Sequence, residues 1–331
     1  MSKKMNKAAL ASAAATYVAA NKQTSGTATS SVESICKMIT KVGAQVTLDG
    51  FYEDKLPELD SFNLPLGTTI EEYFKDLILP ESFTQGVTSA TDEPSTYTPK
   101  YLNVPYEDPA YNYSLGKQRF TVTKPMNNFE RACINAEVAG NLIADDLDCL
   151  QKSRAMWKYA VKKQLLGNAI AKAIALNKKV AVPAISDAED GEAWIEKIKR
   201  CVEDMSFAHD ETIASNVTAM IGSTPSATLY VKKGVLTSLQ VKTLAGAFNP
   251  QELNLGINVK VVDDFGNADI GDDSGDVVGI LVDDRAIRLH QVDSSVYVEP
   301  QYANQQVTTY AFEEYTGFIS KFCYMRAIVL E

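Results

Sequence analysis

A long run of helical periodicity after residue 127 constrains the fold more than any other feature of this sequence. Asn127 or Asn128 can cap its start. Even if Gly140 interrupts it, residues 141–176 would form a helix roughly 50 Å long at 1.5 Å per residue. Lys and Arg residues occupy the other face, so we expect a spine that lies across a sheet with that face exposed. The apolar positions recur at steps of mostly three, four or seven, which places them on one helical face: Ile143, Leu147, Leu150, Trp157, Val161, Leu165, Leu166, Ile170 and Ile174.

A strand precedes this helix, and a second helix and a further strand follow it. Residues 119–125, RFTVTKP, alternate between polar and apolar side chains, as a half-buried strand does. Residues 187–207 place Trp194, Ile198 and Cys201 on one helical face. The segment ATLYV at 227–231 reads as a strand.

The last third of the chain is predicted to be rich in antiparallel strands. A helical stretch at 233–244 leads to a strand and turn at 257–265. From Asp276 onward we expect short strands separated at Asp283–Asp284, at Asp293–Ser294 and at Gly317. The predicted fold class is therefore α+β.

Residues 50–116 show little regular pattern apart from a short helix expected at 68–79. Prolines interrupt this stretch at 57, 65, 80, 94, 99, 105 and 109. An irregular segment of this length is unusual inside one compact domain, so we expect it to extend outward and find its contacts on other chains. Tyrosines are common at protein interfaces. The candidate subunit contacts in this stretch are Tyr97, Tyr101, Tyr106, Tyr111 and Tyr113.

The N-terminal part reads as an arm. A Ser/Thr-rich linker at 21–31 precedes an amphipathic helix at 32–42 that carries Ile35 and Ile39. This helix would pack on its own domain or dock on a neighbouring subunit, so both isoleucines are candidate contacts. The Lys-rich and Ala-rich residues 1–20 resemble a weak secretory signal, although their apolar core is interrupted by polar residues.

Composition excludes several classes of protein. The net charge of −10 disfavours a protein that reads nucleic acid directly, but it suits a wall around packed nucleic acid. The five cysteines are scattered without the spacing of a zinc site and are expected to be reduced thiols. No stretch approaches the length of a membrane span.

Motifs for catalysis are absent from the sequence. Neither His209 nor His290 lies in a hydrolase or metalloprotease pattern, and no phosphate-binding glycine loop occurs. The acidic residues of the segment 263–276 could offer oxygens to Ca²⁺, but their spacing does not match a calcium loop, which favours a surface loop. We therefore expect no enzymatic activity and no cofactor.

The order of these segments resembles the major capsid proteins of tailed double-stranded DNA bacteriophages, which have the Hong Kong 97-type fold. The likeness rests on the order of arm, Pro-rich extension, RFTVTKP, spine helix, ATLYVKKGVLTSLQV and the final YTGFISKFCYMRAIVLE. It is architectural, covers nearly the whole chain, and assigns no cross-linking or processing residue. The resemblance implies an N-terminal arm at 1–50, an extended loop at 51–118, a peripheral domain with the spine helix at 119–205, an axial domain at 206–300, and strands returning to the peripheral domain at 301–331.

The function implied by this resemblance is self-assembly. Copies of the chain would form pentamers and hexamers of an icosahedral shell that encloses double-stranded DNA, with only non-specific DNA contact and no membrane contact. Portal, scaffolding or decoration proteins would be further partners, and the virion capsid would assemble in the host cytoplasm. The alternatives are an encapsulin-like nanocompartment shell, a secreted surface-layer protein, an enzyme of unknown type, or another phage structural protein.

Overall fold

The computed structural model describes most of the chain after residue 110 and short pieces before it. The described residues are 3–5, 11, 12, 15, 36, 37, 46–48, 55–65, 68, 70, 111–128, 136–205, 226–244, 257–266, 277–320 and 323–331. Two of the short pieces, β1 (Lys3–Met5) and β2 (Val46–Leu48), pair as parallel strands. The helices expected at 32–42 and 68–79 lie almost entirely outside the described residues.

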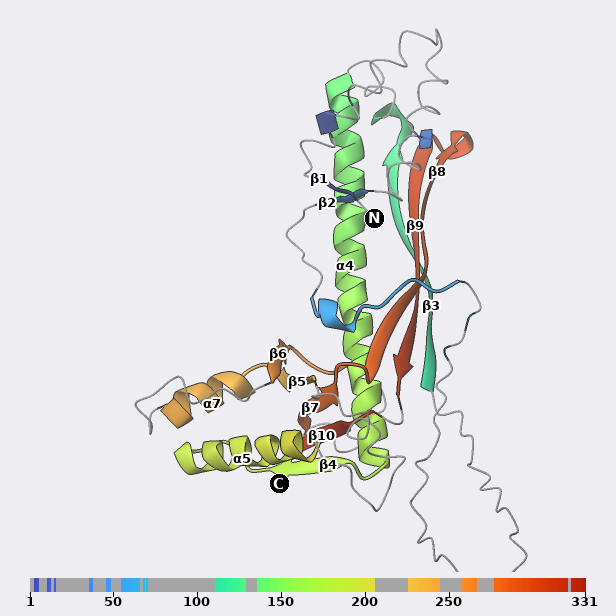
Figure 1. Cartoon of the computed structure of the whole chain (residues 1–331). Helices are drawn as coiled ribbons and strands as arrows, with labels where there is room; N and C mark the ends of the chain where they lie inside the picture. The colour runs from blue at the N-terminus through green and yellow to red at the C-terminus, as the bar shows by residue number, and fades with distance from the viewer. Residues whose placement is uncertain are drawn as a thin grey trace, which may run out of the picture.

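The spine helix α4 (Ala136–Ala175) runs through the long axis of the molecule (Figure 1). Its 40 residues correspond to roughly 60 Å at 1.5 Å per residue. The predicted spine is confirmed, and Gly140 lies inside the helix without interrupting it. The apolar stripe is buried at Leu147, Leu150, Val161, Leu165, Leu166 and Ile170. Among the described residues, no helix is both long and apolar enough to cross a membrane.

A three-stranded antiparallel sheet lies alongside α4. Its strands are β3 (Tyr111–Pro125), β8 (Ile287–Gln301) and β9 (Gln306–Ile319), in the order β3-β9-β8, and the 3₁₀ turn η5 (Tyr302–Asn304) joins β8 to β9. Trp157 of α4 packs between Phe120 and Tyr315, with ring centroids 5.9 and 5.3 Å away. The helix therefore covers one face of this sheet, as Figure 1 shows.

A mixed five-stranded sheet lies at the C-terminal end of α4. Its order is β4 (Lys179–Val182), β10 (Met325–Leu330), β7 (Val277–Asp283), β5 (Ala227–Lys232) and β6 (Asn258–Val262). Helices α5 (Ala188–Asp204) and α7 (Val235–Leu244) accompany this sheet and project from the spine (Figure 1). The side chain of Asp187 caps α5 by accepting a hydrogen bond of 3.0 Å from the Asp190 amide.

Two hydrophobic clusters hold these layers together. One joins α4 to both sheets and includes Leu165, Ile170, Ile280, Tyr315 and Ala327. The other lies between the five-stranded sheet and α5, and includes Trp194, Ile198, Cys201, Leu229 and Ile328. The apolar face predicted for α5 is therefore buried as expected, because its residues at three- and four-residue spacing all reach one sheet.

The predicted breaks in the last third of the chain are partly wrong. Asp283–Asp284 ends β7 as expected, but β8 continues through Asp293–Ser294 and β9 continues through Gly317. At Asp293 the chain has a register shift and not a turn. At Gly317 a Cβ would lie 2.6 Å from Leu165 Cδ1, so this glycine permits close packing of β9 on α4.

Both sheets combine strands from different segments of the expected division. Strand β4 and helix α5, from the segment 119–205, belong with the five-stranded sheet. Strand β8 lies mostly in the segment 206–300 but pairs with β9 in the three-stranded sheet, and β10, from 301–331, joins the five-stranded one. In both sheets, strands that are far apart in the sequence therefore pair with each other.

Candidate assembly site at the spine helix

Residues 55–65 form a short segment that is bound both to α4 and to the edge of β8. We call residues 55–65 the strap. It contains the 3₁₀ turn η1 (Pro57–Leu59), and Leu56 has a positive φ of 56°, which is uncommon for a residue with a side chain. The Ser61 amide donates to the Leu289 carbonyl at 2.9 Å, and the Leu64 amide donates to the Gln291 carbonyl at 3.0 Å. The strap thus behaves as a partial fourth strand at the β8 edge.

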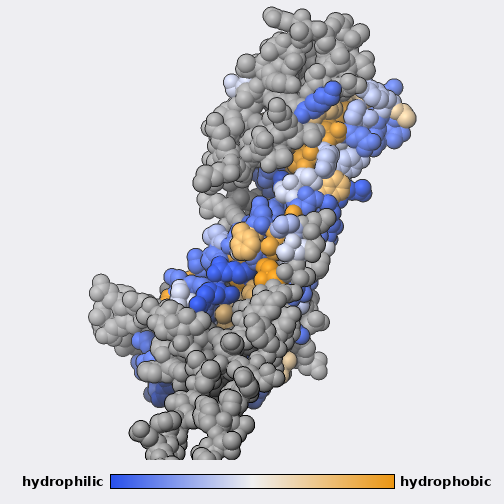
Figure 2. Space-filling view, turned by 45° about the vertical axis from the view of Figure 1, so that its right-hand side comes forward, coloured by the Kyte–Doolittle hydropathy of each residue, from blue (hydrophilic) through white to orange (hydrophobic). Residues whose placement is uncertain are grey.

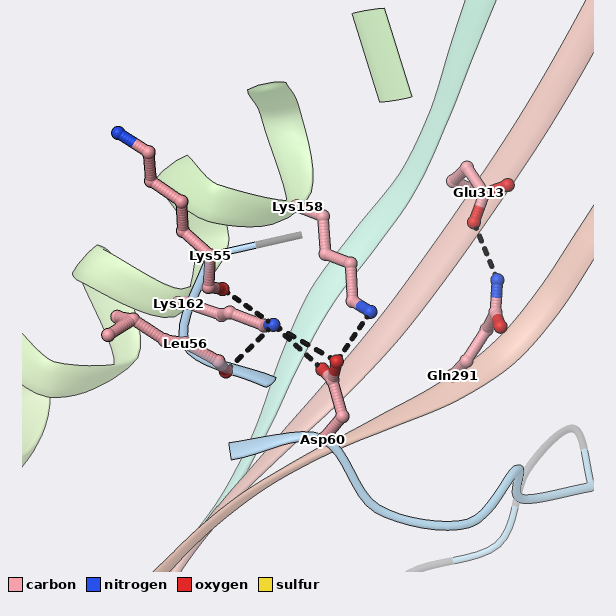
Figure 3. Close-up of polar contacts among 7 residues, drawn as sticks. All are labelled: Lys55, Leu56, Asp60, Lys158, Lys162, Gln291 and Glu313. Carbon is pink, nitrogen blue, oxygen red and sulfur yellow. Dashed lines mark hydrogen bonds and ion pairs between the residues drawn. The ribbon is translucent and has the colours of Figure 1, made fainter. Parts of the chain in front are cut away.

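A buried lysine of α4 holds the start of the strap (Figure 3). The Lys162 side chain is 0% exposed, and its ammonium donates to the carbonyls of Lys55 and Leu56 and to the Asp60 carboxylate, each at 3.0 Å. Lys158, one turn earlier, reaches the same carboxylate at 2.8 Å. All three ammonium donors of Lys162 are satisfied, which is the condition for burying a charge at tolerable cost.

A buried glutamate joins α4 to the three-stranded sheet. The Glu313 side chain is 0% exposed and forms an ion pair with Arg154 of α4. Gln291 and Ser294 donate hydrogen bonds to its two oxygens at 2.8 and 3.0 Å; Figure 3 draws the bond from Gln291. Burial lowers the pKa of Arg154 from its usual range. A second buried carboxylate, Asp146, pairs with Lys124 of β3, and burial raises the pKa of Asp146.

The start of the acidic segment 263–276 is also bound to α4. Tyr159 Oη donates to Asp263 at 2.6 Å, and Lys163 donates to Asp263 at 3.0 Å and to Asp264 at 3.1 Å. Burial by itself would raise the pKa of Asp263, but the hydrogen bonds from Tyr159 and Lys163 outweigh it and lower the pKa to about 2. Burial and the bond to Asp263 raise the pKa of Tyr159 to about 12.

These contacts correct one expectation from the sequence. The cationic face of α4 was predicted to be exposed, but Lys158, Lys162 and Lys163 are covered by the strap and by the residues after β6. The sequence contained one signal that Lys162 is buried, because this lysine lies beside the apolar residues Val161 and Leu165. Only the fold could supply its carboxylate partner, which lies about a hundred residues earlier in the chain.

The predicted contact residues fall mostly outside the described part of the chain. This applies to Ile35, Ile39, Tyr97, Tyr101 and Tyr106. Of the other two, Tyr111 pairs with Ile319 at the start of β3, and Tyr113 is partly buried against the core that joins α4 to the sheets.

Ile70 and Asn112, which lie on either side of the undescribed residues 71–110, are hydrogen-bonded to each other. The Asn112 side chain donates to the Ile70 carbonyl at 2.8 Å and accepts from the Ile70 amide at 3.3 Å. This pair joins the residue before the segment to β3 directly after it. Ile70 therefore lies at the first residues of β3, in the same half of the three-stranded sheet to which the strap is attached.

The one histidine that lies among the described residues is part of the packed core. His290 is buried, its Nδ1 lies 2.9 Å from the Phe62 carbonyl, and the Phe62 ring packs edge-on against it at 4.8 Å. His209 lies outside the described residues. Within the described residues, no cluster of His, Cys, Asp or Glu has the geometry of a metal site. The calcium candidates between Gly266 and Val277 lie outside the described residues.

Apolar side chains are exposed in separate patches along the described surface, between hydrophilic ones (Figure 2). Among the described residues, the large hydrophobic side chains that are exposed are Phe62, Met156, Leu176, Val241, Val261, Tyr297 and Tyr302.

Comparison with known families decides which kind of assembly this is. The model of the Phi29-like phage major capsid proteins matches residues 1–330 of the chain. The chain belongs to this family. It is a structural protein of the phage capsid shell, and the nanocompartment and surface-layer alternatives are not favoured. The sequence has no significant match among curated proteins.

Solved phage structures share the fold of this capsid protein at low sequence identity. A chain of Mycobacterium phage Adephagia is 12% identical with a TM-score of 0.53, covering 83% of this chain and 89% of that one. A chain of the mature capsid of bacteriophage PhiM1 is 13% identical with a TM-score of 0.52, covering 85% of this chain and 89% of that one. A chain of the capsid of Staphylococcus phage Andhra is 12% identical with a TM-score of 0.54, covering 86% of each chain. These likenesses show a capsid-like fold that mixes helices and sheets, in agreement with the α+β prediction.

Proposed function

We propose that this capsid protein assembles with copies of itself, as pentamers and hexamers, into an icosahedral shell around double-stranded DNA. The observation that carries the proposal is the family match over residues 1–330. The extended body supports it, since a spine of 40 residues gives one subunit breadth, and a closed shell needs contacts on several sides of each subunit.

The arrangement we propose is that of the Hong Kong 97-type fold with redrawn domains. The spine helix and the three-stranded sheet would form the peripheral domain, and the five-stranded sheet with α5 and α7 would form the axial domain. Residues 1–50 would be the N-terminal arm, and residues 51–118, which include the strap and the first residues of β3, would be the extended loop. The support is that the two sheets meet α4 at different levels (Figure 1), and that the five-stranded sheet also packs on α5.

The arm and the loop would supply the contacts between subunits. Ile35 and Ile39 of the arm, Tyr97, Tyr101 and Tyr106 of the loop, and Tyr111 and Tyr113 at its end are the proposed contact residues. The Asn112–Ile70 pair supports a loop that projects as one unit, because it closes the loop at its base. The strap would fix the direction from which that loop leaves the body.

Contact with the packaged DNA would be non-specific. A chain with a net charge of −10 repels a polyanion on average, which allows packed DNA to move along the shell wall. The role would be non-enzymatic, and portal, scaffolding or decoration proteins would be further partners. Assembly would take place in the host cytoplasm.

Negative-stain microscopy of the purified, overexpressed chain tests the proposal. We expect closed particles, or capsomer-sized rings that close when protein concentration rises. A sample that stays monomeric and uniform at high concentration in analytical ultracentrifugation would contradict self-assembly. Lys199→Met, a substitution on the exposed face of α5, serves as a matched control that should assemble like the wild type.

A further inference from the structure

Both edge strands of the three-stranded sheet contain an extra residue, and both insertions lie at one level. In β3, Leu115 and Gly116 together lie opposite Tyr315 of the middle strand β9. Gly116 has a φ of 73°, the left-handed conformation that a bulge of this kind requires and that glycine adopts without strain. In β8, Val292 is the extra residue, next to the same Tyr315.

The bulge in β8 changes which side chains face α4. In a regular strand, residues three apart point to opposite faces. Gln291 and Ser294 are three apart, yet both donate to the Glu313 carboxylate on the face that packs on α4. The extra residue reverses the alternation between them. The bulge thus completes the buried site in which Glu313 meets Arg154.

The same two bulges place an ion pair across the opposite face. Lys117 of β3 and Asp293 of β8 both lie opposite Glu314 of β9, which alternates with Glu313 and so points away from α4. The Lys117 ammonium crosses β9 and pairs with Asp293. Because Lys117 also lies beside Glu314, its charge neutralises two carboxylates that would otherwise face each other. We call the Lys117–Asp293 pair the brace.

An extra residue in both edges, but not in the middle strand, forces the sheet to bend at this level. Each insertion adds about 3.3 Å to an edge strand, and a bulge increases the local twist. On the inner face, α4 contacts the sheet at the same level through Trp157 against Tyr315. Below this level lie both attachments of the loop region: the strap on β8 and the Asn112–Ile70 pair on β3.

We propose that the two bulges form a bending line across the three-stranded sheet, and that the brace sets the angle at which the sheet bends there. Residues 111–114, 287–291 and 315–319 move as the lower half relative to the rest of the sheet. This movement turns Ile70 and Asn112, which flank the segment 71–110, and so adapts identical chains to positions of different curvature in a shell. This inference rests on the proposed assembly and names the part of the subunit that adapts to the curvature of the shell.

The test compares brace variants in particles and in the unassembled chain. Full-length wild type, Lys117→Met, Asp293→Asn and the control Lys199→Met are imaged by cryo-electron microscopy, and their amide hydrogen exchange is measured before assembly. We expect Lys117→Met and Asp293→Asn to increase the fraction of particles outside the main diameter class at least twofold. Lys117→Met should act more strongly, because it leaves Asp293 and Glu314 facing each other.

Exchange of the amides at 111–118 and 287–295 should rise severalfold in both brace variants, while the urea midpoint of global unfolding stays close to that of wild type. Particle diameters and local exchange equal to wild type in both variants would overturn the bending line. Absence of particles from the wild type would contradict the proposed assembly instead, and the exchange measurement would still decide the bending line.

Discussion

The two faces on which helices pack in this protein are built from different chemistry. Where α4 packs on the three-stranded sheet and on the strap, charged side chains are buried at Asp146, Lys162 and Glu313, each with an ionic partner. Between α5 and the five-stranded sheet, the buried cluster is apolar around Trp194 and Ile198. Buried ion pairs add little net stability, but they penalise any other arrangement heavily. We infer that the buried ion pairs of the spine region fix how α4 is placed on the sheet, and that the apolar contacts of α5 contribute more to the free energy of folding.

The largest effect is expected from breaking the buried charge site. Glu313→Leu leaves the Arg154 guanidinium buried without its carboxylate, so we expect a loss of about 3–5 kcal/mol in the free energy of unfolding. Urea unfolding followed by Trp157 fluorescence, in a Trp194→Phe background, measures it. Glu203→Leu, an exposed change on α5, is the control. A loss below about 1 kcal/mol would mean that Arg154 finds another partner and that the site does not fix the spine.

The apolar face should respond differently. Ile198 is fully buried under α5, so Ile198→Ala should cost about 2–5 kcal/mol through lost burial and the cavity left behind. The change should appear in Trp194 fluorescence and leave hydrogen exchange of the strap amides unchanged. Faster exchange at residues 55–65 would show that the two faces are not independent.

A smaller effect is expected where β9 approaches α4. Gly317→Ala places a methyl group 2.6 Å from Leu165 Cδ1, and relief requires movement of that leucine. We expect a destabilisation of about 1–3 kcal/mol from overpacking. The double variant Gly317→Ala, Leu165→Ala should cost less than the sum of its single changes, as thermal or urea unfolding would reveal. If the two costs are additive, the destabilisation does not come from the contact between residue 317 and Leu165.

The smallest effect is a dependence of stability on pH at Asp263. Its pKa is about 2 in the folded chain, below the ordinary value of 3.8, so its contribution is fully present above about pH 5 and is lost as pH falls toward 2. Since the Asp263 side chain is 43% exposed, solvent screening keeps this contribution below about 1 kcal/mol. Asp263→Asn should flatten the stability curve between pH 5 and 2. Equal slopes for variant and wild type would contradict this.

Helices α4, α5 and α7 and most of the described strand positions could be predicted from the sequence, but the continuity of the long strands could not. Periodicity at three and four residues located α4 and α5, because each buries one face against one partner. The alternation in β3 and β8 reverses at the bulges near Gly116 and Val292, so the sequence suggested a later start for β3 and a break in β8. Gly317 suggested a turn, whereas its missing side chain makes room for Leu165.

The buried ionic contacts were also beyond sequence reasoning. Lys162 looked like a solvated residue because its charge favours exposure, and Asp60 lies in a stretch with no regular pattern. Only a fold that brings the strap onto α4 pairs them. A lysine directly beside two buried apolar residues was a signal of burial, but it did not identify the partner.

A cryo-electron microscopy structure of the assembled particle tests the central claim most directly. The account predicts that α4 keeps its contacts with the strap and with residues 119–125, 293–301 and 306–314 of the three-stranded sheet in every subunit, while residues 32–42 and 71–110 lie against neighbouring copies. It would be contradicted if the tyrosines at 97, 101 and 106 packed on the body of their own chain in subunits that make few contacts with one another.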